Sequence, residues 1–369
     1  METEHRVYTG DARSLDEIED DAVELVVTSP PYPMIEMWDD VFASLNGKVA
    51  DKLANGDGRA AFAAMHEELD AVWKEVRRVL VDGGIACVNV GDATRTVDGN
   101  FRVYQNHARI VEAFESLGFE PLPEILWRKP ANAGAKFMGS GMLPPNAYVT
   151  LEHEYVLVFR NGPEHREFEP GADPRYEAAY FWEERNRWFS DLWTEIRGEL
   201  QTLEKGELRE RSAAYPFEIP YRLVNMYSVY GDTVLDPFWG TGTTSLAAMA
   251  AGRSSIGYEL EGEFVSVFED RVEDVPRMSR EVVERRLADH EAFVERQARA
   301  GETLEYEAEN YSFPVQTSQE SSIRLYTVSA VRSTEEGYVA AHEPVAGSGM
   351  RNGNGNGSGA DDPPPSPDG

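Results

Sequence analysis

Cysteine is almost absent from this sequence, because Cys87 is the sole thiol in 369 residues. A single thiol excludes a disulfide framework and any zinc site built from several cysteines. No apolar run approaches the roughly 18 residues of a membrane-spanning helix. Residues 1–8 are charged rather than apolar, which is not typical of a secretory signal. Together these absences predict a cytoplasmic protein that needs neither a metal nor a membrane.

Lysine is the second scarce residue. Six lysines accompany 29 arginines, and 66 acidic residues outnumber the 35 basic ones, for a formal net charge of −31. In dilute buffer such a charge would repel nucleic acid. The acid is spread along the whole chain, however, which is typical of proteins from a very salty cytoplasm, where charges are screened within about 3 Å. In that setting the net charge does not exclude DNA; the alternative is an acidic surface for a binding partner.

Apolar strands alternate with amphipathic helices, which favours an open α/β sheet. The segment between residues 160 and 215 is different, because it is aromatic and charged without a clear period, and it could pack a small subdomain or contact bases. A charged helix with a thin apolar stripe, expected to lie on the surface, follows at 280–300. The expected strands are 23–27, 85–90, 123–127, 155–159, 233–235 and 255–258, and the expected helices are 61–80, 107–117, 221–229, 243–251 and 263–272.

A glycine-rich turn, Asp-Pro-Phe-Trp-Gly-Thr-Gly-Thr-Thr, lies between a strand and a helix at residues 236–244. Glycines let the backbone approach a ligand closely, and a helix start offers free N–H groups. In Rossmann-like sheets a nucleotide-type cofactor binds at this turn, and Glu259 at the end of the next strand could accept hydrogen bonds from both ribose hydroxyls. No lysine follows the glycines, which disfavours a phosphate-binding P-loop. The flanking strands favour a cofactor site over an ordinary tight turn.

A second motif, Thr-Ser-Pro-Pro-Tyr, follows a buried strand at residues 28–32. The two prolines fix the backbone and supply no N–H, so their carbonyls can be held toward a pocket. Ser29 adds a hydroxyl acceptor and Tyr32 an aromatic face. This combination suits a planar base whose exocyclic amine is held while its ring is stacked. On this motif alone, a Pro-Pro turn with a packed tyrosine is an equal alternative.

The two motifs in this order resemble those of the β-class amino-methyltransferases of DNA, which use S-adenosylmethionine (SAM). The resemblance runs from residue 8 to about 271, with further matches at 10–12, 75–84, 124–130, 153–157, 215–217 and 231–238. It implies a Rossmann-like SAM-dependent methyltransferase sheet with permuted motif order, plus a small target-recognition region.

The resemblance also implies a division of the chain. Residues 1–160 would form the catalytic part with the target-base motif, 161–215 a target-recognition insertion, and 216–275 the SAM-binding part. Residues 276–345 would be a helical and extended extension. The tail at 346–369 consists of Gly, Asn, Ser, Asp and Pro, so we expect it to be disordered.

By the same resemblance, Ser29 and the Pro30 carbonyl would accept hydrogen bonds from the target amine, beside Pro31, while Tyr32 stacks on the flipped base. Serine at the start of this motif is typical of cytosine-N4 enzymes, whereas aspartate is typical of adenine-N6 enzymes and asparagine of enzymes acting on glutamine. Methyl transfer would be direct and in line, with most of the rate coming from positioning. The residues implied for SAM binding are Asp11 at the adenine, Glu259 at the ribose, and Asp236, Pro237, Phe238, Gly240, Gly242 and Thr243.

DNA is the implied partner, as double-stranded DNA with a short target. Arginine, lysine and asparagine read base edges, although a surface ion pair is a common alternative for each such side chain. The candidate DNA contacts are Arg128, Lys129, Asn132, Lys136, Arg185 and Arg187. Haloarchaeal enzymes to which the chain is similar include standalone enzymes that modify CTAG, which makes CTAG a candidate target.

The sequence therefore predicts a site-specific DNA cytosine-N4 methyltransferase. Cytosine-C5 chemistry is disfavoured, because Cys87 lies inside an expected core strand. The alternatives are an adenine-N6 methyltransferase, a non-catalytic DNA-binding protein of the same fold, and an RNA or protein methyltransferase. A cognate restriction enzyme would be a separate subunit, because this chain carries no nuclease signature.

Overall fold

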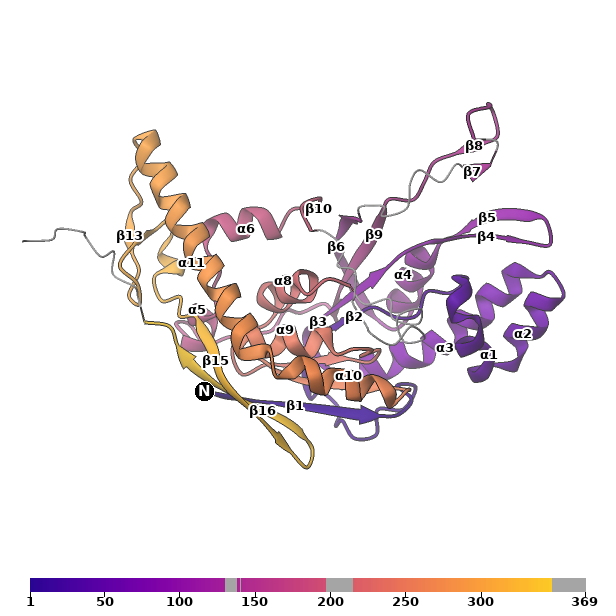
Figure 1. Ribbon diagram of the computed structural model, residues 1–369, viewed down its shortest axis with the longest axis horizontal. Helices are drawn as coiled ribbons and strands as arrows, with labels where there is room; N and C mark the ends of the chain where they lie inside the picture. The colour runs from indigo at the N-terminus through magenta and orange to yellow at the C-terminus, as the bar shows by residue number, and fades with distance from the viewer. Residues whose placement is uncertain (130–137, 140, 197–214, 347–369) are drawn as a thin grey trace, which may run out of the picture.

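The computed structural model describes residues 1–129, 138, 139, 141–196 and 215–346. Its centre is a ten-stranded sheet with the order β10-β6-β9-β3-β2-β11-β12-β1-β16-β15 (Figure 1). The strands of this sheet are β1 (Glu2–Thr9), β2 (Val23–Thr28), β3 (Leu80–Val90), β6 (Phe119–Arg128), β9 (His153–Asn161), β10 (Leu192–Trp193), β11 (Thr233–Asp236), β12 (Ser254–Glu259), β15 (Tyr326–Thr334) and β16 (Gly337–Pro344). The expected α/β sheet is confirmed.

The middle of the sheet is parallel, because β3, β2, β11, β12 and β1 all run in the same direction. Strands covered on both faces are apolar on both, and β2 shows this clearly. Val26 packs into the core on one face, whereas Leu25 and Val27 pack into the core on the other. Both expected motifs follow parallel strands, so they meet at the same edge of the sheet.

Helices cover both faces of this sheet (Figure 1). The helices are α1 (Asp39–Leu45), α2 (Gly47–Ala54), α3 (Gly58–Val79), α4 (Asn106–Ser116), α5 (Asp173–Glu177), α6 (Trp182–Trp188), α8 (Glu218–Tyr227), α9 (Thr243–Ala251), α10 (Glu263–Val272) and α11 (Val275–Ala300), with 3-10 turns η1 (Glu36–Trp38) and η2 (Ser318–Glu320). The five helices expected on either side of the two motifs are present with shifts of a few residues. Among the described residues, no helix combines the length and apolar character needed to cross a membrane.

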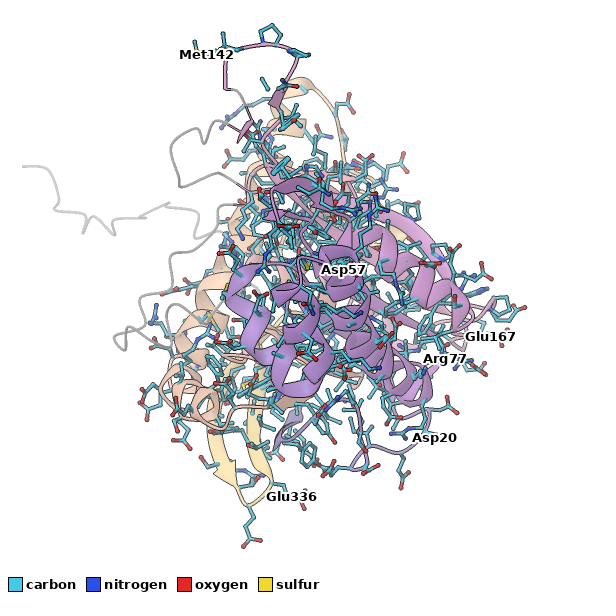
Figure 2. The ribbon with its side chains drawn as sticks, turned by 90° about the vertical axis from the view of Figure 1, so that its right-hand side faces the viewer. Asp20, Asp57, Arg77, Met142, Glu167 and Glu336 are labelled. Carbon is cyan, nitrogen blue, oxygen red and sulfur yellow. The ribbon has the colours of Figure 1, made fainter. Side chains whose placement is uncertain are left out.

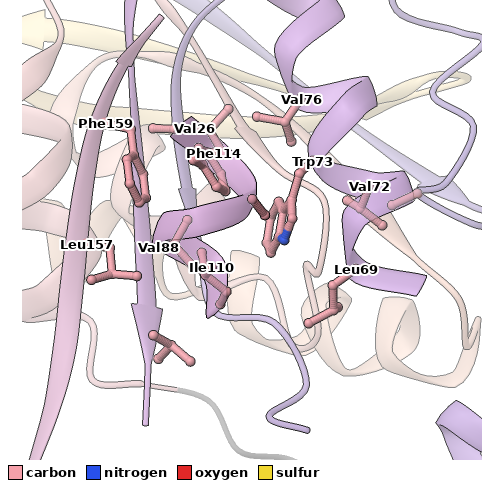
Figure 3. Packing of buried hydrophobic residues seen from close by; sticks show 14 of the residues in the cluster. Val26, Leu69, Val72, Trp73, Val76, Val88, Ile110, Phe114, Leu157 and Phe159 are labelled. Carbon is pink, nitrogen blue, oxygen red and sulfur yellow. The ribbon is translucent and has the colours of Figure 1, made fainter. Parts of the chain in front are cut away.

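Helix α3 packs its apolar side against the sheet and α4. Trp73 contacts Phe114 of α4 with ring centroids 5.1 Å apart, and Phe114 stacks on Phe159 of β9 at 4.2 Å (Figure 3). The helix starts three residues earlier than expected, since the Asp57 carboxylate accepts a hydrogen bond from the Ala60 amide and caps it. It ends at Val79, one residue before the expected end, and Gly83 and Gly84 lie within β3.

In its described part, the aromatic segment after β9 divides its rings between the core and the surface, where Trp182 and Phe189 are exposed. Trp188 and Trp193 are buried, and β10 adds a short strand beside β6. Helix α11 begins at Val275 and is less solvated than its charged sequence indicates. Its Arg286 is buried and forms two hydrogen bonds with buried Glu184 at 2.6 and 2.8 Å, which joins the extension to this segment.

Among the residues that the structure describes, three two-stranded pairs lie outside the main sheet. They pair β4 (Ala93–Val97) with β5 (Asn100–Tyr104), β7 (Met138–Gly139) with β8 (Ala147–Tyr148), and β13 (Tyr306–Glu307) with β14 (Pro314–Val315). The first two project side by side from one end of the molecule, whereas β13 lies near the other end (Figure 1). The expected disordered tail, 346–369, lies outside the described residues from position 347 onward.

Candidate active site

A pocket opens where the parallel strands end, and both motifs line it. The strands β2 and β11 are neighbours, with Leu25 opposite Val234 and Val26 opposite Leu235, so the segments that follow them are brought together. The expected site residues that line the pocket are Asp11, Ser29, Pro30, Pro31, Tyr32, Asp236, Pro237, Phe238, Gly240, Thr243 and Glu259.

Gly242 does not line the pocket but supports the turn beneath it. Its φ of +75° lies in the left-handed region, and a Cβ there would come within 2.3 Å of the Phe268 ring. Trp239 fills the same space from the other side, with its indole N–H donating to Ser245 Oγ at 2.8 Å. A glycine is therefore required here by both conformation and packing.

Asp236 joins the two motifs through its buried carboxylate. The Thr28 hydroxyl donates to Oδ1 and the Thr244 hydroxyl donates to Oδ2, each at 2.6 Å, and the Phe238 amide donates to Oδ1 at 3.1 Å. Burial raises the pKa of Asp236 to about 6. These donors hold the carboxylate in place without adding a positive charge.

Glu259 closes the glycine-rich turn from the end of β12. Its Oε2 accepts from the Gly240 amide at 2.8 Å, and its Oε1 accepts from the Glu261 amide at 2.9 Å. Burial raises the pKa of Glu259 to about 7. Two carboxylates whose charged forms are disfavoured, facing one pocket, suit a ligand that brings positive charge.

Asp11 faces the same end of the pocket but is already paired. The Arg13 guanidinium donates to Oδ1 and Oδ2 of Asp11, and Arg13 also contacts Glu68. Burial alone would raise the pKa of Asp11, but the hydrogen bonds from Arg13 hold it below its usual value. A ligand amine that binds Asp11 therefore has to share this carboxylate with Arg13.

The other end of the pocket contains a hydrogen-bond network around Tyr32. The Tyr32 hydroxyl donates to Glu154 Oε2 at 3.0 Å, and Asn89 Nδ2 donates to both of these oxygens at 2.9 and 2.7 Å. Lys129 Nζ contacts Glu154 Oε1 at 2.8 Å. The Tyr32 ring lies against Gly91, where a Cβ would come within 3.1 Å of it. Each polar group thus helps to fix the plane of the tyrosine.

The same network orients the Ser29 hydroxyl. Ser29 Oγ lies 3.1 Å from the Tyr32 oxygen, and the single proton of that tyrosine already goes to Glu154. The Ser29 hydroxyl is therefore the donor of this pair, and its lone pairs remain available as acceptors. A ligand that offers N–H groups matches this end of the pocket.

The candidate DNA contacts are spread over the molecule and several are paired. Arg128 contacts Glu152 at 3.1 Å and Arg187 contacts Asp289 at 3.2 Å, whereas the Arg185 guanidinium lies 6.0 Å from the centre of the Phe189 ring. Lys129 holds Glu154, as described above. Asn132 and Lys136 lie outside the described residues.

Asn89 and Glu154 were not among the expected site residues, although the sequence held a signal for each. Asn89 is a polar residue within the buried strand β3, and Glu154 is the second residue of β9, before the apolar part of that strand. Both are buried, and buried polar groups require partners. In the described ranges, no three His, Cys, Asp or Glu side chains come together as a metal site.

Comparison with known families decides the identity of the fold and its chemistry. A family model described as DNA methylase, of the N6/N4 type, matches residues 23–270, which include both motifs. The chain belongs to the N6/N4 DNA methylase family. The expected membership among the amino-methyltransferases of DNA is thereby confirmed: this DNA methylase uses SAM, and its partner is double-stranded DNA.

Two similar relatives are archaeal. The DNA methylase is 51% identical over 328 residues to the Type II methyltransferase M.MthZI of Methanothermobacter thermautotrophicus, covering 88% of this chain and 91% of the relative. It is also 51% identical over 281 residues to the Type II methyltransferase M.MjaI of Methanocaldococcus jannaschii, covering 73% and 91%.

A solved structure gives the same result for the fold. It is a proposed DNA modification methylase from Thermus thermophilus, complexed with S-adenosyl-L-methionine. It is similar to this DNA methylase with a TM-score of 0.57 and 32% identity, covering 72% of this chain and 92% of that one. The expected Rossmann-like methyltransferase sheet is therefore confirmed.

Proposed function

We propose that this DNA methylase is a site-specific Type II enzyme that methylates the exocyclic N4 amine of cytosine. The observation that carries the proposal is the Ser29 hydroxyl, whose proton is directed at Tyr32 while its lone pairs stay available. An exocyclic amine offers two N–H groups and needs such an acceptor. Serine at the first position of the motif favours cytosine over adenine by the resemblance, and the Type II class follows the two archaeal relatives.

At the base end, Ser29 and the Pro30 carbonyl hold the amine of the flipped cytosine, and Tyr32 stacks on its ring. Pro31 fixes the backbone between them. Holding the hydrogens of the amine directs the nitrogen lone pair along the pocket. Because the groups are fixed before the reaction, most of the rate comes from positioning.

At the cofactor end, the geometry suits SAM, which supplies an electrophilic methyl group on a sulfonium when bound. Glu259 would accept hydrogen bonds from the ribose hydroxyls, and Asp11 would meet the adenine amine. Asp236, Pro237, Phe238, Gly240 and Thr243 would surround the methionine end, with Gly242 shaping the turn that presents them.

The proposal also assigns the DNA target sequence, the parts of the chain and the salt conditions in which the protein works. We assign CTAG as the target, residues 161–215 as the recognition insertion, and Arg128, Lys129, Arg185 and Arg187 as candidate contacts to the duplex. The catalytic and SAM-binding parts would be 1–160 and 216–275, with 276–345 as an extension. The net charge of −31 supports a very salty cytoplasm as the working environment.

One experiment tests substrate, atom and cofactor together. Labelled SAM and unmethylated genomic DNA are incubated with the protein in high salt, and the product is analysed by nucleoside mass spectrometry and by sequencing of the modified sites. N4-methylcytosine within CTAG supports the proposal, and N4-methylcytosine elsewhere overturns the target alone. N6-methyladenine shows that Ser29 does not select cytosine. No methylated base, with SAM bound, supports a non-catalytic DNA-binding protein.

A further inference from the structure

Two hairpins leave the sheet at the edge that carries the target-base motif. The β3–β9 pairing places Val90 opposite Tyr155, and the β6–β9 pairing places Arg128 opposite His153. The end of β3, the end of β6 and the start of β9 therefore share one edge. The β4–β5 hairpin follows β3, and the β7–β8 hairpin lies between β6 and β9. Gly91, shortly before the β4–β5 hairpin, lies against Tyr32 and Glu154, and the β7–β8 hairpin is followed by β9, which contains Glu154.

The two hairpins form one projection. The Phe101 ring of β5 stacks on the Tyr148 ring of β8, with centroids 5.2 Å apart and planes 4° from parallel. Figure 1 shows both hairpins extending away from the body of the molecule, and Figure 2 shows Met142 at its outer end. The projection is thus held together by an aromatic contact, although each hairpin alone is short.

The solvent-exposed side chains of this projection are apolar, whereas exposed side chains are usually polar. Met142 is 79% exposed and Val149 is 81% exposed. Exposed apolar side chains gathered in one place indicate a binding surface. We call it the apolar hairpin surface, and it consists of Phe101, Val103, Met142, Leu143, Tyr148 and Val149.

Its charge also differs from that of the rest of the chain. All 66 acidic residues lie outside the segment 125–151 of the sequence, which includes β7 and β8. The β4–β5 hairpin adds Arg95 and Arg102 against one acid, Asp98. A chain with a net charge of −31 thus leaves one projection without its general acidity, and that projection follows strands that end at the edge of the sheet with the base pocket. Phosphate would be repelled by acid at this place.

We propose that the apolar hairpin surface contacts the target duplex directly, by inserting apolar side chains into a groove next to the flipped base. Methionine, leucine and phenylalanine are residues that architectural proteins insert between base steps. A base that leaves the stack also leaves apolar neighbours uncovered, which such side chains can contact. The inference rests on DNA as the substrate and does not depend on which base is methylated.

The test compares two exposed tyrosines at opposite ends of the molecule. Tyr148→Ser lies in the apolar hairpin surface, and Tyr306→Ser, in β13, is the matched control with a similar exposed aromatic ring. A double variant, Met142→Ser with Leu143→Ser, changes the outer end of the hairpin without touching the Phe101–Tyr148 stack. Affinity for a short fluorescein-labelled duplex of mixed sequence is measured over a range of salt concentrations, with SAM affinity as the check on folding.

We expect Tyr148→Ser and the double variant to weaken duplex binding about tenfold at every salt concentration. The slope of log affinity against log salt should stay that of the parent, because apolar contacts release no counterions. Tyr306→Ser should bind like the parent, and all variants should bind SAM equally well.

Three results would overturn the inference. Parental duplex affinity in both hairpin variants would show that the surface does not contact DNA. A reduced salt slope would show that phosphate contacts were lost instead. A parent that is dimeric by light scattering, with monomeric variants, would show that the surface joins two copies of the chain. Because binding is measured, failure here is distinct from failure of the cytosine-N4 assignment.

Discussion

The carboxylates at the two ends of the pocket lie in opposite electrostatic settings. At the base end, Glu154 receives the Tyr32 hydroxyl, the Asn89 amide and the Lys129 ammonium. At the cofactor end, Asp236 and Glu259 accept from hydroxyls and backbone amides, and burial raises their pKa values to about 6 and about 7. Glu154 has a cation of its own, whereas at the cofactor end only Asp11 is paired with one, through Arg13, and the charged forms of Asp236 and Glu259 are disfavoured by burial.

The difference shows at which end of the pocket the charges are already balanced before SAM and the target base bind. SAM carries a sulfonium and an ammonium group, so its binding brings positive charge to carboxylates that burial has made reluctant to ionise. The base end is already fixed by its own hydrogen bonds. We therefore expect cofactor binding to be coupled to proton release, and target-base positioning to be independent of that coupling.

The largest expected effect concerns the surface rather than the pocket. If the general acidity reflects a salty environment, the protein should lose its cooperative thermal transition and its activity at low salt, because unscreened surface carboxylates repel one another. Circular dichroism melts over a salt series check this. Full activity and a cooperative melt in dilute buffer would contradict it, and the raised pKa values in the pocket would then be the main electrostatic feature.

Tyr32→Ala tests the base end alone. Without the ring and its hydroxyl the target base loses its platform, and we expect kcat to fall about 10²-fold while SAM affinity stays unchanged. Steady-state kinetics and calorimetry measure the two quantities. Tyr32→Phe is the matched control, because it keeps the ring and removes only the contacts to Glu154 and Ser29. Equal losses in transfer and SAM binding would show that the two ends are not independent.

The pH dependence of SAM binding tests the cofactor end. In the free protein Glu259 is protonated below about pH 7 and cannot then accept from both ribose hydroxyls. SAM affinity should therefore fall as the pH falls from about 8 to about 6, by at most about tenfold per pH unit. Glu259→Gln should bind SAM more weakly at the upper end and keep only the weaker dependence near pH 6 that comes from Asp236, as measured by calorimetry.

The stability of the free protein should change in the opposite sense. Between the usual glutamate pKa of 4.5 and the raised value of about 7, the folded state binds more protons at Glu259 than the unfolded state. Its contribution to stability is therefore lost as pH rises through this window. Melting temperatures with and without SAM check this sign, and an apo stability that increases through the window in the parent relative to Glu259→Gln would contradict it.

The smallest effect is expected for the Lys129–Glu154 pair. Glu154→Gln removes the charge but leaves an acceptor for Tyr32, so we expect kcat to fall about tenfold with SAM affinity unchanged. Lys129→Met should have a similar effect, and the double variant should lose less than the product of the two. Fully multiplicative losses would show that Lys129 acts independently of Glu154, through its proposed contact to the duplex alone.

Much of the fold could be predicted because its central strands are short apolar runs between amphipathic helices. Strand β1 could not be predicted in this way, because its buried side chains are polar. Thr3 and His5 are buried and form a hydrogen bond with each other at 2.8 Å. Thr3 also bonds to His342 at 2.8 Å, and His5 bonds to Ser255 at 2.9 Å. The partners His342 and Ser255 lie far away along the chain, so the hydrophobic pattern carries no signal for this strand.

The two ends of the pocket also differ in how far the sequence predicts them. Both motifs follow parallel strands, so their meeting at one edge follows from the chain order and the sheet alone. The network around Tyr32 depends instead on the antiparallel register of β9 between β3 and β6, which sets Glu154 beside Asn89 and Lys129. That register is decided by packing across the sheet and is not visible in the sequence. The sequence therefore gives no sign that Lys129 pairs with Glu154, and Lys129 was predicted to contact DNA.

Cys87 has a practical consequence for experiments on this protein. It is fully buried in β3, and burial raises the pKa of its thiol, so little reactive thiolate is present. A maleimide dye should leave the parent chain unlabelled. Met142→Cys and Tyr306→Cys would then each carry one dye at a known end of the molecule, with no native thiol to remove first. Energy transfer to a labelled duplex could follow the approach of each end to DNA in real time.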